Sequence, residues 1–306
     1  MIEDDIFRET FLHILKELEI PNFAISIQKS DFEKLKKAHD SIHEFIYLPT
    51  RLINSDAEFR AKSAFLFYHS EVFDQAHRSL LVALSGYYNA AYTLLRNTLE
   101  LLIKGAFWEC MAHKKYRVKN EIIRKTGRKI EKSKKTIVDW LNDIINQKPL
   151  IENELEKTSA GIFDKISPLF EDKNLSKIIP NVKSMVEQLA EWRIFDPIEN
   201  PLKYVYDDIY KELSADIHVV PDRTNIGRRL LAEKELFETE VIPDEINKYT
   251  ETLHKVMDIG IVAELNILED LTNMNEKVRK WLNEWLFVIT DLELNSASRK
   301  IAKMVK

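Results

Sequence analysis

Polar side chains that could carry chemistry recur along one face of the most apolar long segment, residues 87–113. Arg96, Glu100 and Lys104 follow one another at steps of four, which places them on one side of a helix. A guanidinium on such a face can stabilise phosphate charge, or the row can be a ladder of ion pairs. Leucines, alanines and aromatic residues fill the other directions. We therefore expect a helix that is buried on most sides, with one polar seam and no membrane partner.

A second polar stripe lies on a later predicted helix and consists of Asp207, Lys211, Ser214 and His218. If the two stripes face each other, they form one pocket in which Arg96 stabilises phosphate charge and His218 acts as a general acid or base. The alternative is that each stripe is a separate structural face. The candidate catalytic residues are Arg96, Glu100 and His218.

Metal binding is a further possibility, because three acidic residues are each followed three positions later by a histidine: Asp40–His43, Asp74–His77 and Glu251–His254. Helical di-iron proteins combine two such pairs with glutamates from two other helices, and Glu100 could be one of these. His39 and His43 also have a metal-binding spacing, but the sequence offers no obvious third ligand. In so acidic a chain, polar faces without a metal are the simpler interpretation. We assign no metal ligands and expect no cofactor.

The segment 114–135 is strongly basic, with a net charge of +9, whereas the whole chain carries −5. Clustered lysine and arginine side chains bind nucleic-acid phosphates, so we expect this arm to bind RNA or a ribonucleoprotein. The alternative is a solvated face that compensates the acidic remainder. The basic residues are Lys114, Lys115, Arg117, Lys119, Arg124, Lys125, Arg128, Lys129, Lys132, Lys134 and Lys135.

The composition predicts an all-α fold. Six glycines and nine prolines are few for 306 residues, which disfavours the many turns of a β or α/β protein. A capping-box pattern at Ser30 opens one helix, and two long apolar helices that meet near Ser85-Gly86 should form an antiparallel hairpin. We expect one continuous helical body over residues 1–306, a single bundle with the long hairpin at its centre.

The C-terminal helical part of this body is predicted over residues 243–295, and Pro243 opens its first helix. Residues 222–242 show no clear pattern, and the tail after Asn295 is expected to fray. One cysteine, Cys110, and an acidic N-terminus without a signal-peptide pattern favour a reducing cytoplasm. Scarce glutamine beside abundant lysine and glutamate favours a thermophilic source.

The motif YNAAYTLLRNTLELLIK, followed later by YKELSADIH, resembles parts of HEPN-like helical proteins, a group of prokaryotic toxin, defence and RNA-directed domains. Ribonucleases of that group carry Arg, often followed by Asn, and then His a few residues further on. Arg96-Asn97 begins this pattern, but Leu101, Leu102 and Ile103 follow instead of a histidine. The resemblance implies a helical dimer in an RNA-related setting. A metal-independent ribonuclease with a rearranged site is the alternative.

The last long predicted helix carries more apolar surface than one core-facing stripe requires. Trp281 and Trp285 share one side, while Phe287 and Val288 lie on others. Because tryptophan is favoured at protein interfaces, we predict a homodimer that uses this helix. The alternative is that both tryptophans fill an intramolecular core.

Overall fold

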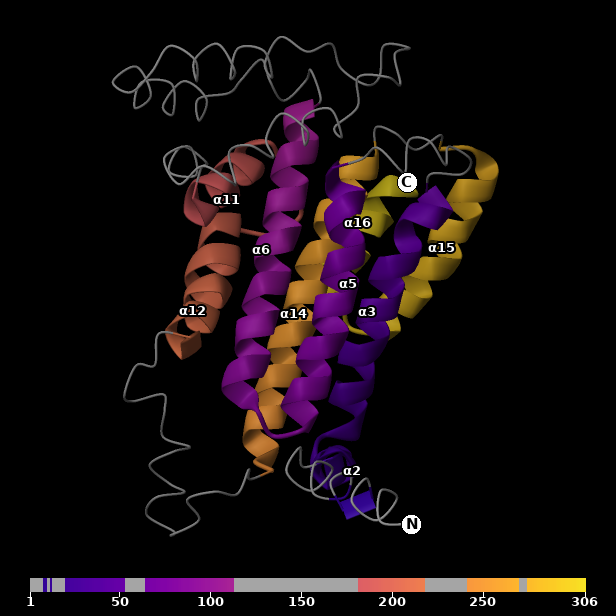
Figure 1. Ribbon diagram of the computed structural model, residues 1–306. Coiled ribbons are helices and arrows are strands. Elements are labelled where there is room, and N and C mark those ends of the chain that lie inside the picture. Colours follow the sequence, from indigo (N-terminus) through magenta and orange to yellow (C-terminus); the bar gives the residue numbers. More distant parts are fainter. Residues whose placement is uncertain are drawn as a thin grey trace, which may run out of the picture.

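The computed structural model describes residues 8–9, 12, 20–52, 64–112, 181–217, 241–269 and 274–306. All regular structure in these ranges is helical, and most of the long helices run side by side in one elongated bundle (Figure 1). The all-α prediction is therefore confirmed. No helix in the described ranges combines the length and apolarity needed to cross a membrane.

The first half of the chain contributes α2 (Ile20–Lys29), α3 (Phe32–Leu52), α5 (Ala64–Leu84) and α6 (Tyr88–Ala112). The second half contributes α11 (Val182–Glu191), the wider-turned π-helix η1 (Leu202–Tyr210), α12 (Lys211–Ile217), α14 (Pro243–Leu268), α15 (Glu276–Asp291) and α16 (Asn295–Met304). In Figure 1, α11 and α12 lie beside α6, on the side of the bundle away from α15.

The predicted hairpin is confirmed as α5 and α6. Gly86 has φ 89°, a left-handed conformation that glycine adopts without steric penalty. The Gly86 and Tyr87 amides donate to the carbonyls of Ala83 and Val82 at 2.9 and 3.1 Å, which closes the end of α5. The chain therefore reverses within a few residues and packs α6 along α5.

The most completely enclosed helix is α14, not α6. Every residue from Val256 to Leu268 is buried, and the helix contacts α3, α5, α6 and α16. At Gly260 a β-carbon would lie 3.1 Å from Leu102 Cδ2 and 3.3 Å from Phe45 Cε2. Glycine at this position therefore allows α14 to approach both α6 and α3.

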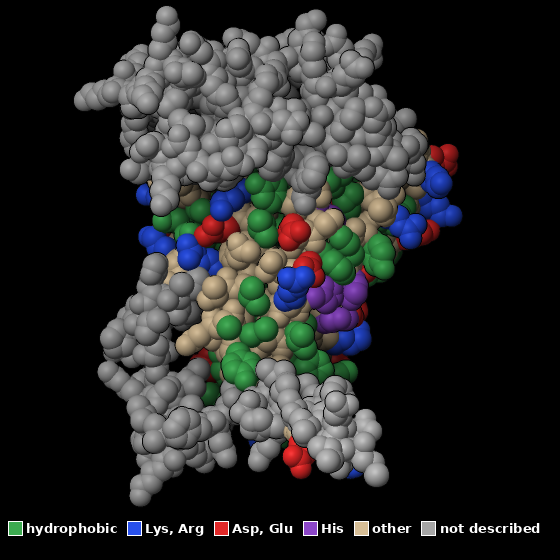
Figure 2. Space-filling view, viewed as in Figure 1, with side chains coloured by type: hydrophobic (Ala, Val, Ile, Leu, Met, Phe, Trp, Pro, Cys, Tyr) green, Lys and Arg blue, Asp and Glu red, His purple; other side chains and the backbone are tan. Residues whose placement is uncertain are grey.

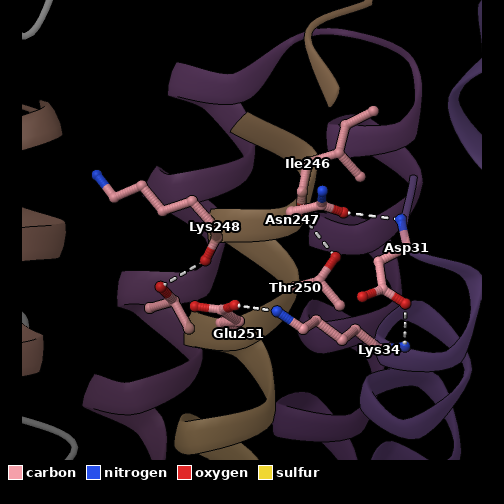
Figure 3. Close-up of polar contacts among 8 residues, drawn as sticks. Asp31, Lys34, Ile246, Asn247, Lys248, Thr250 and Glu251 are labelled. Atoms are coloured by element: carbon pink, nitrogen blue, oxygen red, sulfur yellow. Dashed lines mark hydrogen bonds and ion pairs between the residues drawn. The ribbon is translucent and has the colours of Figure 1, made fainter. Parts of the chain in front are cut away.

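The corner between α2 and α3 is held by the start of α14 (Figure 3). The Asp31 amide donates to Asn247 Oδ1 at 2.9 Å, and Lys34 Nζ lies 2.6 Å from Glu251 Oε1. The cap of α3 is Asp31, which accepts from the Lys34 amide at 3.3 Å, rather than the predicted Ser30. These contacts fix α2 at one end of the bundle, next to α3 and α5.

The prediction that the C-terminal tail frays is wrong, because α16 has a cap from a distant residue. Leu294 precedes the helix and offers no side-chain acceptor. Asp258 on α14 accepts from the Ser296 and Ala297 amides instead, at 3.1 and 2.9 Å. Lys300 also pairs with Glu269 at 2.6 Å, so α16 is fastened to α14 at two places.

Trp285 on α15 is buried within the chain, and its indole N–H donates to Glu44 on α3. Trp281 stacks on Trp285 with 5.0 Å between ring centroids. These contacts match the intramolecular alternative for the two tryptophans. Phe287 and Val288 remain 77% and 44% exposed on the same helix.

Candidate metal centre

The polar seam of α6 meets η1, and the residue that joins them is Tyr210. Arg96 Nη2 lies 3.0 Å from Glu100 Oε1 and donates to the Tyr210 hydroxyl at 2.8 Å. That hydroxyl donates to Glu100 Oε1 at 2.9 Å, and Lys104 donates to Glu100 Oε2 at 3.0 Å. Arg96, Glu100 and Tyr210 thus close a small hydrogen-bonded ring.

The hydrogen bonds of this ring keep Glu100 ionised and Tyr210 protonated. Burial would raise the pKa of Glu100, but hydrogen bonds from Lys104 and Tyr210 and the charge of Arg96 outweigh it, so the pKa is lowered. Partial burial raises the pKa of the Tyr210 hydroxyl, which therefore stays protonated and available as a donor. The arrangement is that of a structural link between α6 and η1.

The other predicted site residues are placed differently. Ser214 donates to the Tyr210 carbonyl at 2.7 Å, and Asp207 forms an exposed ion pair with Lys211. His218 and the basic residues of 114–135 lie outside the described residues. The structure therefore joins Arg96 and Glu100 but does not place His218, and the catalytic role of these three residues stays a prediction.

Two of the predicted acid–histidine pairs come together between α3 and α5. One ring nitrogen from each of His39, His43 and His77 lies within 4.8 Å of the others. His39 Nε2 and His43 Nε2 are 3.3 Å apart, and the His77 ring centroid lies 5.7 and 5.1 Å from those of His39 and His43. Figure 2 shows histidine side chains gathered at one place on the surface, with charged and hydrophobic side chains beside them.

Hydrogen bonds on the far sides of two rings decide which nitrogens are free. His39 Nδ1 lies 3.2 Å from Asp40 Oδ1, and His77 Nδ1 lies 3.1 Å from the Phe73 carbonyl. Both partners can only accept when Asp40 is ionised, so each Nδ1 carries the proton and each Nε2 presents its lone pair. Histidine ligands of metals are commonly oriented in this way by a carboxylate or a carbonyl.

The local electrostatics favour the neutral forms of His43 and His77. Burial lowers the pKa of His43, and the neighbouring His39 and His77 lower it further. Burial also lowers the pKa of His77. Partial burial would raise the pKa of Asp40, but hydrogen bonds from Lys36 and His39 outweigh it and lower the pKa. A metal requires neutral imidazoles, and the lowered pKa values of His43 and His77 favour this form.

The aspartates of two of these acid–histidine pairs form ion pairs with neighbouring basic side chains. Asp40 binds Lys36 at 2.9 Å with its second oxygen, and Asp74 binds Arg78 at 2.7 Å. The third pair is elsewhere, because Glu251 binds Lys34 (Figure 3) and the His254 ring lies 2.8 Å from the Leu292 carbonyl. Within the described ranges, neither Glu100 nor Glu251 joins the histidine cluster, so the carboxylate-rich set of a di-iron site is not assembled there.

A cavity of about 640 Å³ lies next to the cluster, between α2, α3 and α5. Its volume is within the range of small-molecule sites. The walls are mostly apolar, with His39, His77, Lys36 and Arg78 as the polar contributors. The apolar lining residues are Phe23, Ile27, Phe32, Leu35, Leu80, Leu81 and Leu84.

A second histidine site is closed to solvent. His69 and Glu264 are 4% and 0% exposed, and His69 Nδ1 lies 3.5 Å from Glu264 Oε1. Burial lowers the pKa of His69 to about 4 and raises that of Glu264 well above its usual value. Both shifts favour the uncharged forms, so we interpret this contact as a neutral pair and not as an ion pair.

No protein-family model, curated protein or solved structure matches the chain. The functional interpretation of the site therefore depends on its geometry alone. The spacing of His39 and His43 was visible in the sequence, but the third histidine was not, because His77 is brought opposite them only by the packing of α5 on α3.

Proposed function

We propose that the protein binds a divalent transition-metal ion of the zinc class through His39, His43 and His77. The observation that carries this proposal is the convergence of three ring nitrogens within 4.8 Å, on two helices. Three neutral imidazoles are the protein ligands of zinc sites that keep a fourth position open for water or a ligand.

The distance between His39 and His43 agrees with such an ion. Zn–N bonds of about 2.0–2.1 Å in tetrahedral geometry place ligand nitrogens about 3.3 Å apart. His39 Nε2 and His43 Nε2 already lie at 3.3 Å. The His39 lone pair faces His43 at this distance, so either a proton on His43 Nε2 or a cation must lie between them. A metal ion replaces that proton, and binding should therefore weaken as the pH falls.

Metal titration with variants tests the proposal. We expect one equivalent of Zn²⁺ or Co²⁺ per chain by calorimetry, and a Co²⁺ absorption spectrum typical of a nitrogen-rich site. Zn²⁺ at 100 times its Kd should add about 2.7 kcal/mol to the free energy of unfolding. His77→Ala should abolish binding, and Asp40→Ala should weaken it about 10- to 100-fold, the usual effect of losing a residue that orients a ligand.

His254→Gln is the matched control, since this histidine is on α14 and outside the cluster. It should leave the metal affinity unchanged. Unaltered Zn²⁺ affinity in His77→Ala, or no stoichiometric binding by the wild type, would refute the proposal.

A second proposed function, supported by the charge of +9 over residues 114–135, is the binding of RNA or a ribonucleoprotein by this basic arm. Affinity for a single-stranded RNA should fall steeply between 50 and about 200 mM salt. Replacing Lys132, Lys134 and Lys135 with Gln should lower both the affinity and the salt slope. A flat response to salt would count against RNA binding. The HEPN-like ribonuclease remains an alternative proposal, tested by RNA cleavage with Arg96→Ala and His218→Ala.

A homodimer is proposed as well, supported by the exposed Phe287 and Val288 on α15. Light scattering after size exclusion should give a mass near twice 36.0 kDa, and Phe287→Glu should lower it to one chain. A wild-type mass of one chain at micromolar concentration would exclude a stable dimer. The cytoplasmic location and the thermophilic source stay predictions from composition.

A further inference from the structure

The cavity beside the histidines has a polar end and an apolar end. Phe45 faces His69 with 4.1 Å between ring centroids, and His39 faces His77 at 5.7 Å, so α3 and α5 run antiparallel. Moving down α3 from His39 to Phe32 therefore corresponds to moving along α5 from His77 to Leu84. The histidines lie at one end of this run, and Phe32 and Leu84 lie at the other.

The lining of the apolar end is suited to contact with a hydrocarbon chain. Phe32 and Leu81, two of its lining residues, are 58% and 54% exposed, which is unusual for side chains of this size. From α2, Phe23 and Ile27 complete the wall without adding a polar atom. An aliphatic chain placed here would cover apolar surface that the described residues leave open to solvent.

The residues at the polar end are suited to bind a ligand with an anionic oxygen atom. His39 and His77 line the cavity, so a ligand inside it would lie beside an ion held by them. Lys36 and Arg78 also reach the cavity, and each is already paired with an aspartate. They contribute a polar rim, while the metal supplies the uncompensated positive charge that a carboxylate would bind.

We infer that the cavity binds a medium-chain aliphatic carboxylate, with its hydrocarbon chain along Phe32, Leu81 and Leu84 and its carboxylate on the metal. The assignment of the head group rests on the proposed metal site. The assignment of the chain rests on the cavity itself.

Three ligands test the assignment of the head group separately from that of the chain. They are decanoate, decanol and acetate, each titrated with and without saturating Zn²⁺. Decanoate should bind at least about tenfold more tightly with Zn²⁺ than without it, a difference of about 1.4 kcal/mol. Decanol should bind weakly and independently of Zn²⁺, and acetate should bind far more weakly than decanoate. Because Leu81 is exposed, Leu81→Asp should fold normally, and it should abolish decanoate binding while Zn²⁺ still binds. Ser85→Asp, in the turn directly after α5 and outside the cavity lining, is the control for an added charge.

The outcomes distinguish the two proposals. If Zn²⁺ binds but decanoate and decanol do not, the cavity does not accept an aliphatic chain and the inference is overturned, while the metal site stands. If decanoate binds equally with and without Zn²⁺, the head-group assignment is wrong. If Leu81→Asp binds decanoate as the wild type does, the chain lies elsewhere. If Zn²⁺ itself does not bind, the proposed metal function is refuted, and the head-group assignment that rests on it is refuted as well.

Discussion

The buried histidine of α5 should make the protein sensitive to mild acid. His69 packs on Phe45, and its Nε2 lies 3.3 Å from the Ile46 carbonyl. That carbonyl can only accept, so Nε2 carries the proton and Nδ1 presents its lone pair to Glu264. A second proton on this ring would place a cation in the core opposite a protonated carboxyl group.

The magnitude follows from the two pKa values of His69. The folded protein holds it at about 4, because burial disfavours the charged ring, whereas an unfolded chain has about 6.5. As the pH falls below about 6.5, the unfolded state takes up a proton that the folded state does not. The free energy of unfolding therefore decreases down to pH 4, by about 3 kcal/mol in total, and this contribution is constant at lower pH.

Urea unfolding between pH 7.5 and 4 measures the effect. In His69→Gln the side chain is neutral throughout, so the variant should lose about 3 kcal/mol less than the wild type over this range. Titrating groups that do not contact His69 contribute equally to both proteins and cancel in the comparison. The variant is expected to be less stable at pH 7, and the informative quantity is the slope.

Tyr249→Phe is the control. Tyr249 is fully buried, and burial raises the pKa of its hydroxyl, so it does not titrate in acid. Its removal should lower stability by a similar amount at every pH. Parallel curves for the wild type and His69→Gln, differing in slope by less than about 1 kcal/mol over the range, would refute the assignment of a neutral, desolvated His69.

Three further substitutions test the packing. Asp258→Ala removes the acceptor of two backbone amides at the start of α16; it should cost about 1–3 kcal/mol and speed hydrogen exchange in that helix, and unchanged exchange would contradict the cap. Gly260→Val places methyl groups against neighbouring helices and should cost about 1–3 kcal/mol in urea unfolding, so an equally stable variant would show that the contact is loose. Tyr210→Phe opens the ring with Arg96 and Glu100 and should cost about 1 kcal/mol in thermal unfolding. If Tyr210→Phe is as stable as the wild type, the hydrogen bonds of this hydroxyl add no net stability over hydrogen bonds to water.

Much of the fold could be predicted because the signals for helices are local. The apolar spacing of the α6 segment, the short reversal at Gly86 and the proline that opens α14 all act within one or two turns. Cys110 lies inside this apolar segment and is buried. Arg96 and Glu100 could be placed on one face for the same reason.

The contacts between helices could not be predicted in this way, because they depend on packing that joins residues far apart in the chain. Tyr210 reaches the α6 seam across 114 positions, and Asp258 caps a helix that starts 37 positions later. The tail after Asn295 was expected to fray, and the cap at the start of α16 is absent from its own local sequence. Trp285 likewise found Glu44 within the same chain.

The sequence by itself determined that two histidines share a helix face, since a spacing of four residues is a property of the helix. It did not determine that a third histidine lies opposite them. That depends on the register of α5 against α3, which is set by buried side chains along both helices, such as Phe45 against His69. Sliding α5 by one turn, about 5.4 Å, would separate His77 from its partners and remove the site. The tertiary structure alone therefore decided that the three histidines converge.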